Sequence, residues 1–123
     1  MQTDLKYARG VSAPGRAKSG MRQVRYYLGQ KNIQKFYDTL FDTLQEYLGN
    51  RFHLPSKGIT ISVIDEHLSR EGVSEEILAK LRDIFRDCDM ARYASVQLTG
   101  EHMQDSLKKL EEIIDYFQRK KYA

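Results

Sequence analysis

Apolar residues recur at three- and four-residue steps over most of the chain, which predicts amphipathic helices. The clearest stripe spans residues 32–48, with Asn32 as a candidate N-cap and Gly49 as a candidate stop. The expected core positions of this helix are Ile33, Phe36, Tyr37, Leu40, Phe41, Leu44, Tyr47 and Leu48. An aromatic stripe with this spacing is typical of core packing rather than of a base-stacking platform.

A helix, a tight turn and a second helix are predicted over residues 63–93. Gly72 is suited to the left-handed conformation that ends a helix, and Ser74 is suited to cap the next one. Thr60 or Ser62 is the candidate cap of the first helix of the pair. The second helix carries one apolar stripe, formed by Ile77, Leu78, Leu81, Ile84, Phe85 and Cys88.

Two further helices complete the expected fold. Pro14 predicts a helix start, so the first helix is expected over residues 14–28, with Met21, Val24 and Leu28 facing a core and residues 1–12 weakly ordered. Thr99 is a candidate cap for a last helix that reaches about residue 121. The expected class is therefore all-α: a single small irregular or orthogonal bundle of about five helices, preceded by a basic N-terminal segment. The expected division is a basic, partly helical segment over residues 1–30 and a bundle domain over residues 31–123.

Charge is distributed unevenly along the 123 residues. The net charge is +3, yet residues 1–35 contain eight Lys and Arg and one acid, Asp4, so the rest of the chain is net negative. A basic leader of this kind favours an anionic partner such as a membrane surface. The candidate membrane contacts are Arg16, Lys18, Arg22 and Arg25.

No catalytic or metal-ligand pattern is found in the sequence. The three histidines are far apart, and the acids at Asp83, Asp87 and Asp89 lack the glycine that a calcium loop needs. The sequence shows no phosphate-binding loop and no nucleophile elbow. We therefore expect no enzyme activity, no cofactor and no metal. Cys88 is expected to be a small buried hydrophobe, because it lies on an apolar stripe.

A helix-turn-helix nucleic-acid reader is the alternative that the pair around Gly72 suggests. Its second helix carries more acids than bases, which disfavours entry into a DNA groove, so nucleic-acid binding is not the preferred interpretation. The basic N-terminal segment keeps nonspecific binding open.

Residues 30–117 resemble the C-terminal cytoplasmic region of the BatD proteins, a bacterial oxygen-tolerance or aerotolerance family. The most specific element of the resemblance is Cys88-Asp89-Met90-Ala91-Arg92-Tyr93-Ala94. Other matching positions are Phe36-Tyr37, Leu40, Leu44, Tyr47-Leu48-Gly49, Leu54-Pro55, Leu68, Gly72-Val73 and Leu81.

The resemblance implies a non-enzymatic protein–protein interaction domain on the cytoplasmic face of the bacterial inner membrane, within a larger membrane-anchored protein. The implied partners are other Bat proteins, of von Willebrand A-type or tetratricopeptide-repeat character. Cys88, Arg92 and Tyr93 are then candidates for a structural or partner-binding role. For Arg92 and Tyr93 the preferred interpretation is structural: Arg92 pairs with a carboxylate, and Tyr93 covers the core.

Overall fold

The protein is all-α. The computed structural model describes residues 5–93 and 98–119, with side chains from residue 15 onward. The helices are α1 (Leu5–Gly29), α2 (Ile33–Phe52), the short α3 (Ile61–Val63), α4 (Glu75–Tyr93) and α5 (Gly100–Arg119). A 3-10 turn at Ser56–Gly58 precedes α3, and a π-helical turn at Ile64–Leu68 continues it. The described ranges contain no strand, which confirms the predicted class.

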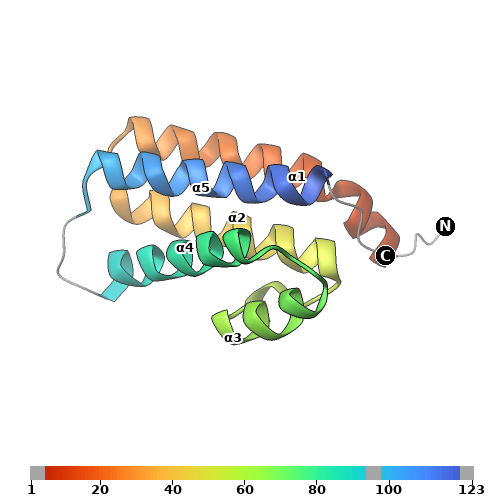
Figure 1. Cartoon of the computed structure of the whole chain (residues 1–123). Helices are drawn as coiled ribbons and strands as arrows, with labels where there is room; N and C mark the ends of the chain where they lie inside the picture. The colour runs from red at the N-terminus through yellow and green to blue at the C-terminus, as the bar shows by residue number, and fades with distance from the viewer. Residues whose placement is uncertain (1–4, 94–97, 120–123) are drawn as a thin grey trace.

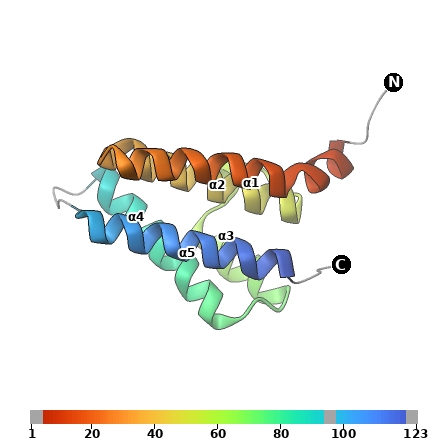
Figure 2. The same cartoon turned by 90° about the horizontal axis from the view of Figure 1, so that it is seen from above.

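In Figure 1 the four long helices have nearly horizontal axes, with α1 uppermost and α4 lowest. Seen from above, α4 crosses beneath α5 at an oblique angle, so the four helices are not all parallel (Figure 2). The short α3 and its π-helical continuation lie below the end of the bundle where α4 begins. The arrangement is therefore an irregular bundle.

The predicted stripe of α2 forms the centre of the core. Phe36, Leu40, Leu44 and Leu48 are at most 1% exposed. The rings of Phe52 and Phe117 meet edge to face, with centroids 5.5 Å apart, and so join α2 to α5. Because fully burying such a side chain contributes about 1.5–3 kcal/mol, this stripe is a main source of the stability of the fold.

The start of α1 corrects the sequence analysis. The helix begins at Leu5 and continues through Pro14, so the predicted start at Pro14 and the weakly ordered residues 5–12 are wrong. Proline is common in the first turn of a helix, but a helix can also contain a proline if it tolerates the missing hydrogen bond. The sequence alone does not distinguish these two cases. The division at residue 30 also needs adjustment. Ala17, Met21 and Val24 belong to the common core, so the second half of the basic segment is a helix of the bundle.

The end of α2 is a second correction. The helix passes through Gly49 and ends at Phe52, where His53 adopts a left-handed conformation with φ 57°. A Cβ atom at Gly49 would lie 2.7 Å from the carbonyl oxygen of Leu54. Gly49 therefore permits the returning chain to approach the helix and does not stop it. The cap at Asn32 is confirmed, because its side chain accepts the N–H of Lys35.

The turn between α3 and α4 is confirmed. Gly72 has a φ of +83°, the left-handed conformation that was predicted for it. The Ser74 hydroxyl accepts the N–H of Ile77 at 3.3 Å and so caps α4. Of the two candidate caps for the preceding helix, the structure uses Thr60, whose hydroxyl accepts the N–H of Val63.

The last helix also begins as predicted. The Thr99 hydroxyl accepts the N–H of His102 at 3.3 Å. The described part of α5 ends at Arg119, and the predicted extension to residue 121 lies outside the described residues. The buried stripe of α5 consists of Met103, Leu107, Leu110, Ile113, Ile114 and Phe117.

Candidate interaction surfaces

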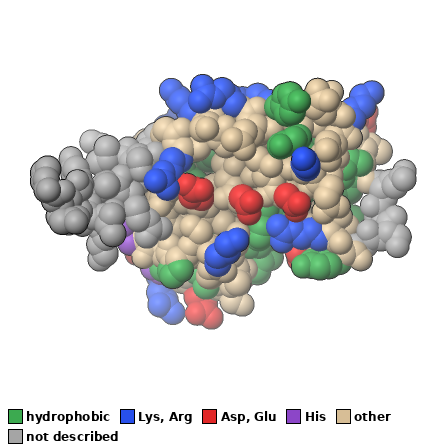
Figure 3. Space-filling view, turned by 180° about the vertical axis from the view of Figure 1, so that it is seen from behind, with side chains coloured by type: hydrophobic (Ala, Val, Ile, Leu, Met, Phe, Trp, Pro, Cys, Tyr) green, Lys and Arg blue, Asp and Glu red, His purple; other side chains and the backbone are tan. Residues whose placement is uncertain are grey.

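The outer face of α1 carries the basic residues that the sequence analysis singled out. Lys18 and Arg22 are one helical turn apart and exposed, while Met21 and Val24 face the core. Figure 3 shows Lys and Arg side chains gathered along the upper edge of the molecule, over α1, with a row of acidic side chains below them. This side of the bundle therefore carries a row of basic side chains beside a row of acidic ones.

Ion pairs separate the four basic candidates into two groups. Arg16 pairs with Glu46 of α2 at 3.0 Å, and Arg25 pairs with Glu111 of α5 at 2.7 Å. Within the described residues, neither Lys18 nor Arg22 forms an ion pair. Lys18 and Arg22 are thus available to an external anion, whereas Arg16 and Arg25 are held against carboxylates at the edges of the face.

An exposed aromatic ring extends this basic face toward the end of α1. Tyr26 is 61% exposed and meets the ring of Tyr27 edge to face, with centroids 5.3 Å apart. It follows Arg22 by one helical turn. Tyrosine is favoured where one end of a side chain is apolar and the other is wet, as at a membrane interface.

The family-like motif at the end of α4 divides into buried and exposed residues. Cys88 is fully buried, and burial raises the pKa of its thiol well above the usual range. The guanidinium of Arg92 lies over the Phe41 ring at 4.7 Å, and its Nε is 3.4 Å from Asp38. The expected carboxylate partner of Arg92 is therefore present.

Tyr93 contradicts its expected packing role. Its side chain is 82% exposed, so the expectation that it covers the core is wrong. The physical reason is its place on the helix: Tyr93 lies at the last position of α4, off the buried stripe that ends at Cys88. Together with Ile61 and Met90 it lines a shallow apolar hollow of about 460 Å³. Arg86 and Asp89 flank that hollow.

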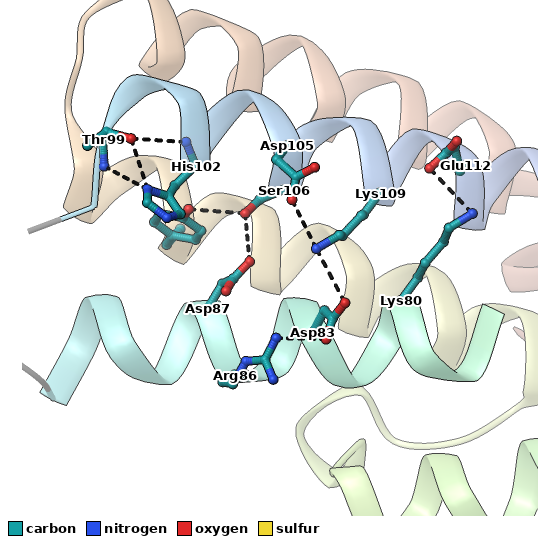
Figure 4. Close-up of polar contacts among 11 residues, drawn as sticks. Lys80, Asp83, Arg86, Asp87, Thr99, His102, Asp105, Ser106, Lys109 and Glu112 are labelled. Carbon is teal, nitrogen blue, oxygen red and sulfur yellow. Dashed lines mark hydrogen bonds and ion pairs between the residues drawn. The ribbon is translucent and has the colours of Figure 1, made fainter. Parts of the chain in front are cut away.

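Polar contacts hold α4 against α5. Lys109 reaches Asp83 at 3.3 Å, and Lys80 reaches Glu112 at 3.5 Å (Figure 4). A buried chain of hydroxyls lies between these helices and α2.

In that chain the Ser106 hydroxyl donates to Asp87 at 3.0 Å, so the Tyr37 hydroxyl, also 3.0 Å from Ser106, is the donor to it. Burial raises the pKa of Tyr37 to about 12. Tyr37 is therefore a neutral hydrogen-bond donor at physiological pH, and the chain of hydroxyls serves packing.

The helix pair around Gly72 has the shape that suggested a nucleic-acid reader, but the bases of α4 are engaged with acids. Arg82 pairs with Asp65 and Glu75, both at 2.9 Å. Arg86 pairs with Asp83 at 2.8 Å. Since a groove-binding helix needs cations directed at phosphates, the outer face of α4 is a poor candidate for that role.

Within the described ranges, no three His, Cys, Asp or Glu side chains are placed to share a metal ion. None of the helices described combines the length and the apolar character that crossing a bilayer requires. A scan against protein-family models, a search of curated proteins and a search of solved structures find no match for this chain. Function therefore has to be argued from the surfaces themselves.

Sequence reasoning missed one feature, an apolar hollow between the α1–α2 turn and the start of α5. Its distinctive residue is Lys31, which has a left-handed φ of 57°. The residue just past the predicted helix end was Gly29, so no local signal marked Lys31 as the left-handed position.

Proposed function

We propose that this chain is a non-enzymatic interaction domain that lies on an anionic membrane surface through the outer face of α1. In this proposal it is the cytoplasmic part of a BatD-like membrane-anchored protein, at the bacterial inner membrane, with a role in tolerance of oxygen or envelope stress. Its partners are other Bat proteins with von Willebrand A-type or tetratricopeptide-repeat domains.

One observation carries the membrane part of the proposal: Lys18 and Arg22 point outward from a helix whose opposite face is fixed in the core, and neither pairs with an acid of the described residues. Each basic residue near an anionic surface contributes about 1 kcal/mol to binding. Tyr26 adds an interfacial aromatic on the same helix. The helix itself is fixed against the core, so binding orders these side chains but not the backbone.

The partner part of the proposal rests on the resemblance at the end of α4. Tyr93 and Met90 lie beside Ile61 in the hollow described above, and a large exposed aromatic next to aliphatic side chains is the usual composition of a protein-binding spot. The lining residues belong to α3 and α4, which lie at the bottom of Figure 1, whereas α1 lies at the top. One side can therefore meet a membrane while the other meets a protein.

The test is cosedimentation of the full chain with vesicles of phosphatidylglycerol and, separately, of phosphatidylcholine. We expect binding to the anionic vesicles only, and we expect it to weaken between about 50 mM and about 500 mM salt, as the Debye length shortens. The double variant Lys18→Glu/Arg22→Glu should abolish binding. The matched control, Lys57→Glu/Arg70→Glu, changes the net charge equally on exposed residues that follow α2.

Equal loss in both double variants would show that only net charge matters and would contradict a specific face. A duplex DNA titration belongs beside this experiment. Sequence-selective DNA binding that survives about 150 mM salt would favour the helix-turn-helix alternative, because nonspecific phosphate contacts weaken steeply over that range.

A further inference from the structure

An apolar cavity of about 520 Å³ opens at one end of the bundle, between the α1–α2 turn and the start of α5. Both ribbon views place these two segments at the same end (Figures 1 and 2). Leu28, Ile33 and Met103 supply its apolar walls. Gly29 and Gly100 also line it, and a Cβ atom at either would meet open space. The volume is within the range of small-molecule sites.

The cavity has one cationic side chain, Lys31. Its backbone is left-handed, with its N–H donating to Leu28 at 3.0 Å and the N–H of Asn32 donating to Tyr27 at 3.1 Å. This pattern is the helix-ending motif whose left-handed position is normally glycine. A lysine there costs backbone free energy that glycine would not. Among the described residues no carboxylate pairs with it, so its charge is available to a ligand.

The first residue of α5 adds a second favourable group for an anion. Gly100 begins that helix and also lines the cavity, so the positive end of the α5 dipole lies at the same cavity as Lys31. Apolar walls with a cation and a helix N-terminus at the rim match a molecule with an apolar chain and a negative head.

We propose that this cavity binds a single-chain anionic amphiphile of the fatty-acid class. The alkyl chain packs against Leu28, Ile33 and Met103, and the carboxylate pairs with Lys31. The two glycines leave room for the chain to approach the backbone. This site is separate from the outer face of α1, and either can fail its test without the other.

The test uses cis-parinaric acid, a fatty acid that fluoresces when it enters an apolar site, added to the full chain without vesicles. Gly29→Leu fills the cavity and should weaken binding at least about tenfold, which corresponds to 1.4 kcal/mol. Gly15→Leu is the matched control, because Gly15 is also on α1 with open space at its Cβ and lines no part of the cavity. Absence of binding by the wild type, or equal affinity of the two variants, overturns the proposal.

The charge is tested by competition between parinaric acid and either a saturated fatty acid or the alcohol of the same chain length. Lys31→Gln should weaken the acid about fivefold or more and leave the alcohol unchanged, since only the acid forms a charge-assisted bond. Lys31→Gly should give the same loss of preference while raising the melting temperature, because glycine relaxes the turn. Acid and alcohol that compete equally against the wild type overturn the assignment of Lys31.

Discussion

The outer faces of α1 and α4 have similar numbers of basic residues but use them differently. On α4, Arg82, Arg86 and Arg92 each lie against a carboxylate of the bundle. On α1, Lys18 and Arg22 have no such partner among the described residues, and only the flanking arginines are paired. The charge available to a binding partner is therefore set by pairing within the fold and not by the count of Lys and Arg in a helix.

The largest expected effect tests whether α1 belongs to the bundle as fully as α4 does. A chain that begins at Asn32 lacks the buried residues Ala17, Met21 and Val24 and exposes the surface of α2 beneath them. At about 1.5–3 kcal/mol for each large apolar side chain, the loss approaches the 5–15 kcal/mol of a typical domain. We expect cooperative thermal unfolding, followed by circular dichroism, to disappear. An unchanged melting temperature would show that residues 31–123 fold without α1, as the predicted division at residue 30 requires.

A smaller effect is expected where α1 and α2 touch most closely. A Cβ atom at Gly20 would lie 2.4 Å from the hydroxyl oxygen of Thr43, which is held by its own hydrogen bond to Thr39. Gly20→Ala should therefore destabilise the protein by about 1–3 kcal/mol, because the two helices must separate.

The matched substitution is Gly15→Ala on the same helix, where a Cβ atom meets nothing. It should stabilise the protein by about 0.5–1 kcal/mol through helix propensity. Urea unfolding at equilibrium measures both changes. Equal shifts in the same direction would mean that α1 does not pack against Thr43 as described.

The neighbouring residues Arg92 and Tyr93 give the next comparison. Arg92→Ala removes a contact with the Phe41 ring and a partly exposed ion pair with Asp38, so we expect a loss of about 1 kcal/mol. Tyr93→Ala should change the free energy of unfolding by less than about 0.5 kcal/mol, because its ring is exposed. A large loss in the free energy of unfolding for Tyr93→Ala, measured in urea, would show that the Tyr93 ring packs against the core.

Most of the fold follows from local sequence signals. The stripes of α2, α4 and α5, the caps at Asn32, Ser74 and Thr99 and the left-handed Gly72 are all decided by residues within one or two helical turns. Such signals are available in a single sequence because periodicity and capping need no distant partner.

The corrections arise where a distant contact gives a residue its role. Only glycine fits at position 49, because the carbonyl oxygen of Leu54 packs against its Cα. Tyr93 lies outside the core because the buried stripe of α4 ends one turn earlier. The partners of Arg16 and Arg25 are 30 and 86 residues away along the chain. The sequence thus identified the basic face but did not show which of its cations are engaged.

The smallest effect concerns those two engaged arginines. Glu46→Gln together with Glu111→Gln removes the carboxylates that hold Arg16 and Arg25, and both ion pairs are largely exposed. Because exposed pairs contribute only about 0–1 kcal/mol, the free energy of unfolding should change little. Each released arginine can then add up to about 1 kcal/mol of attraction to an anionic surface. We expect a several-fold gain in binding to phosphatidylglycerol vesicles.

The control for this gain is Glu66→Gln together with Glu71→Gln, which changes the net charge by the same amount on exposed residues between α3 and α4. Its effect reports the long-range part of the attraction, which salt screens over about 8–10 Å. The difference between the two double variants at equal salt therefore measures the contribution of the released arginines. Equal gains would show that the released arginines add nothing beyond the change of net charge, and would contradict the prediction.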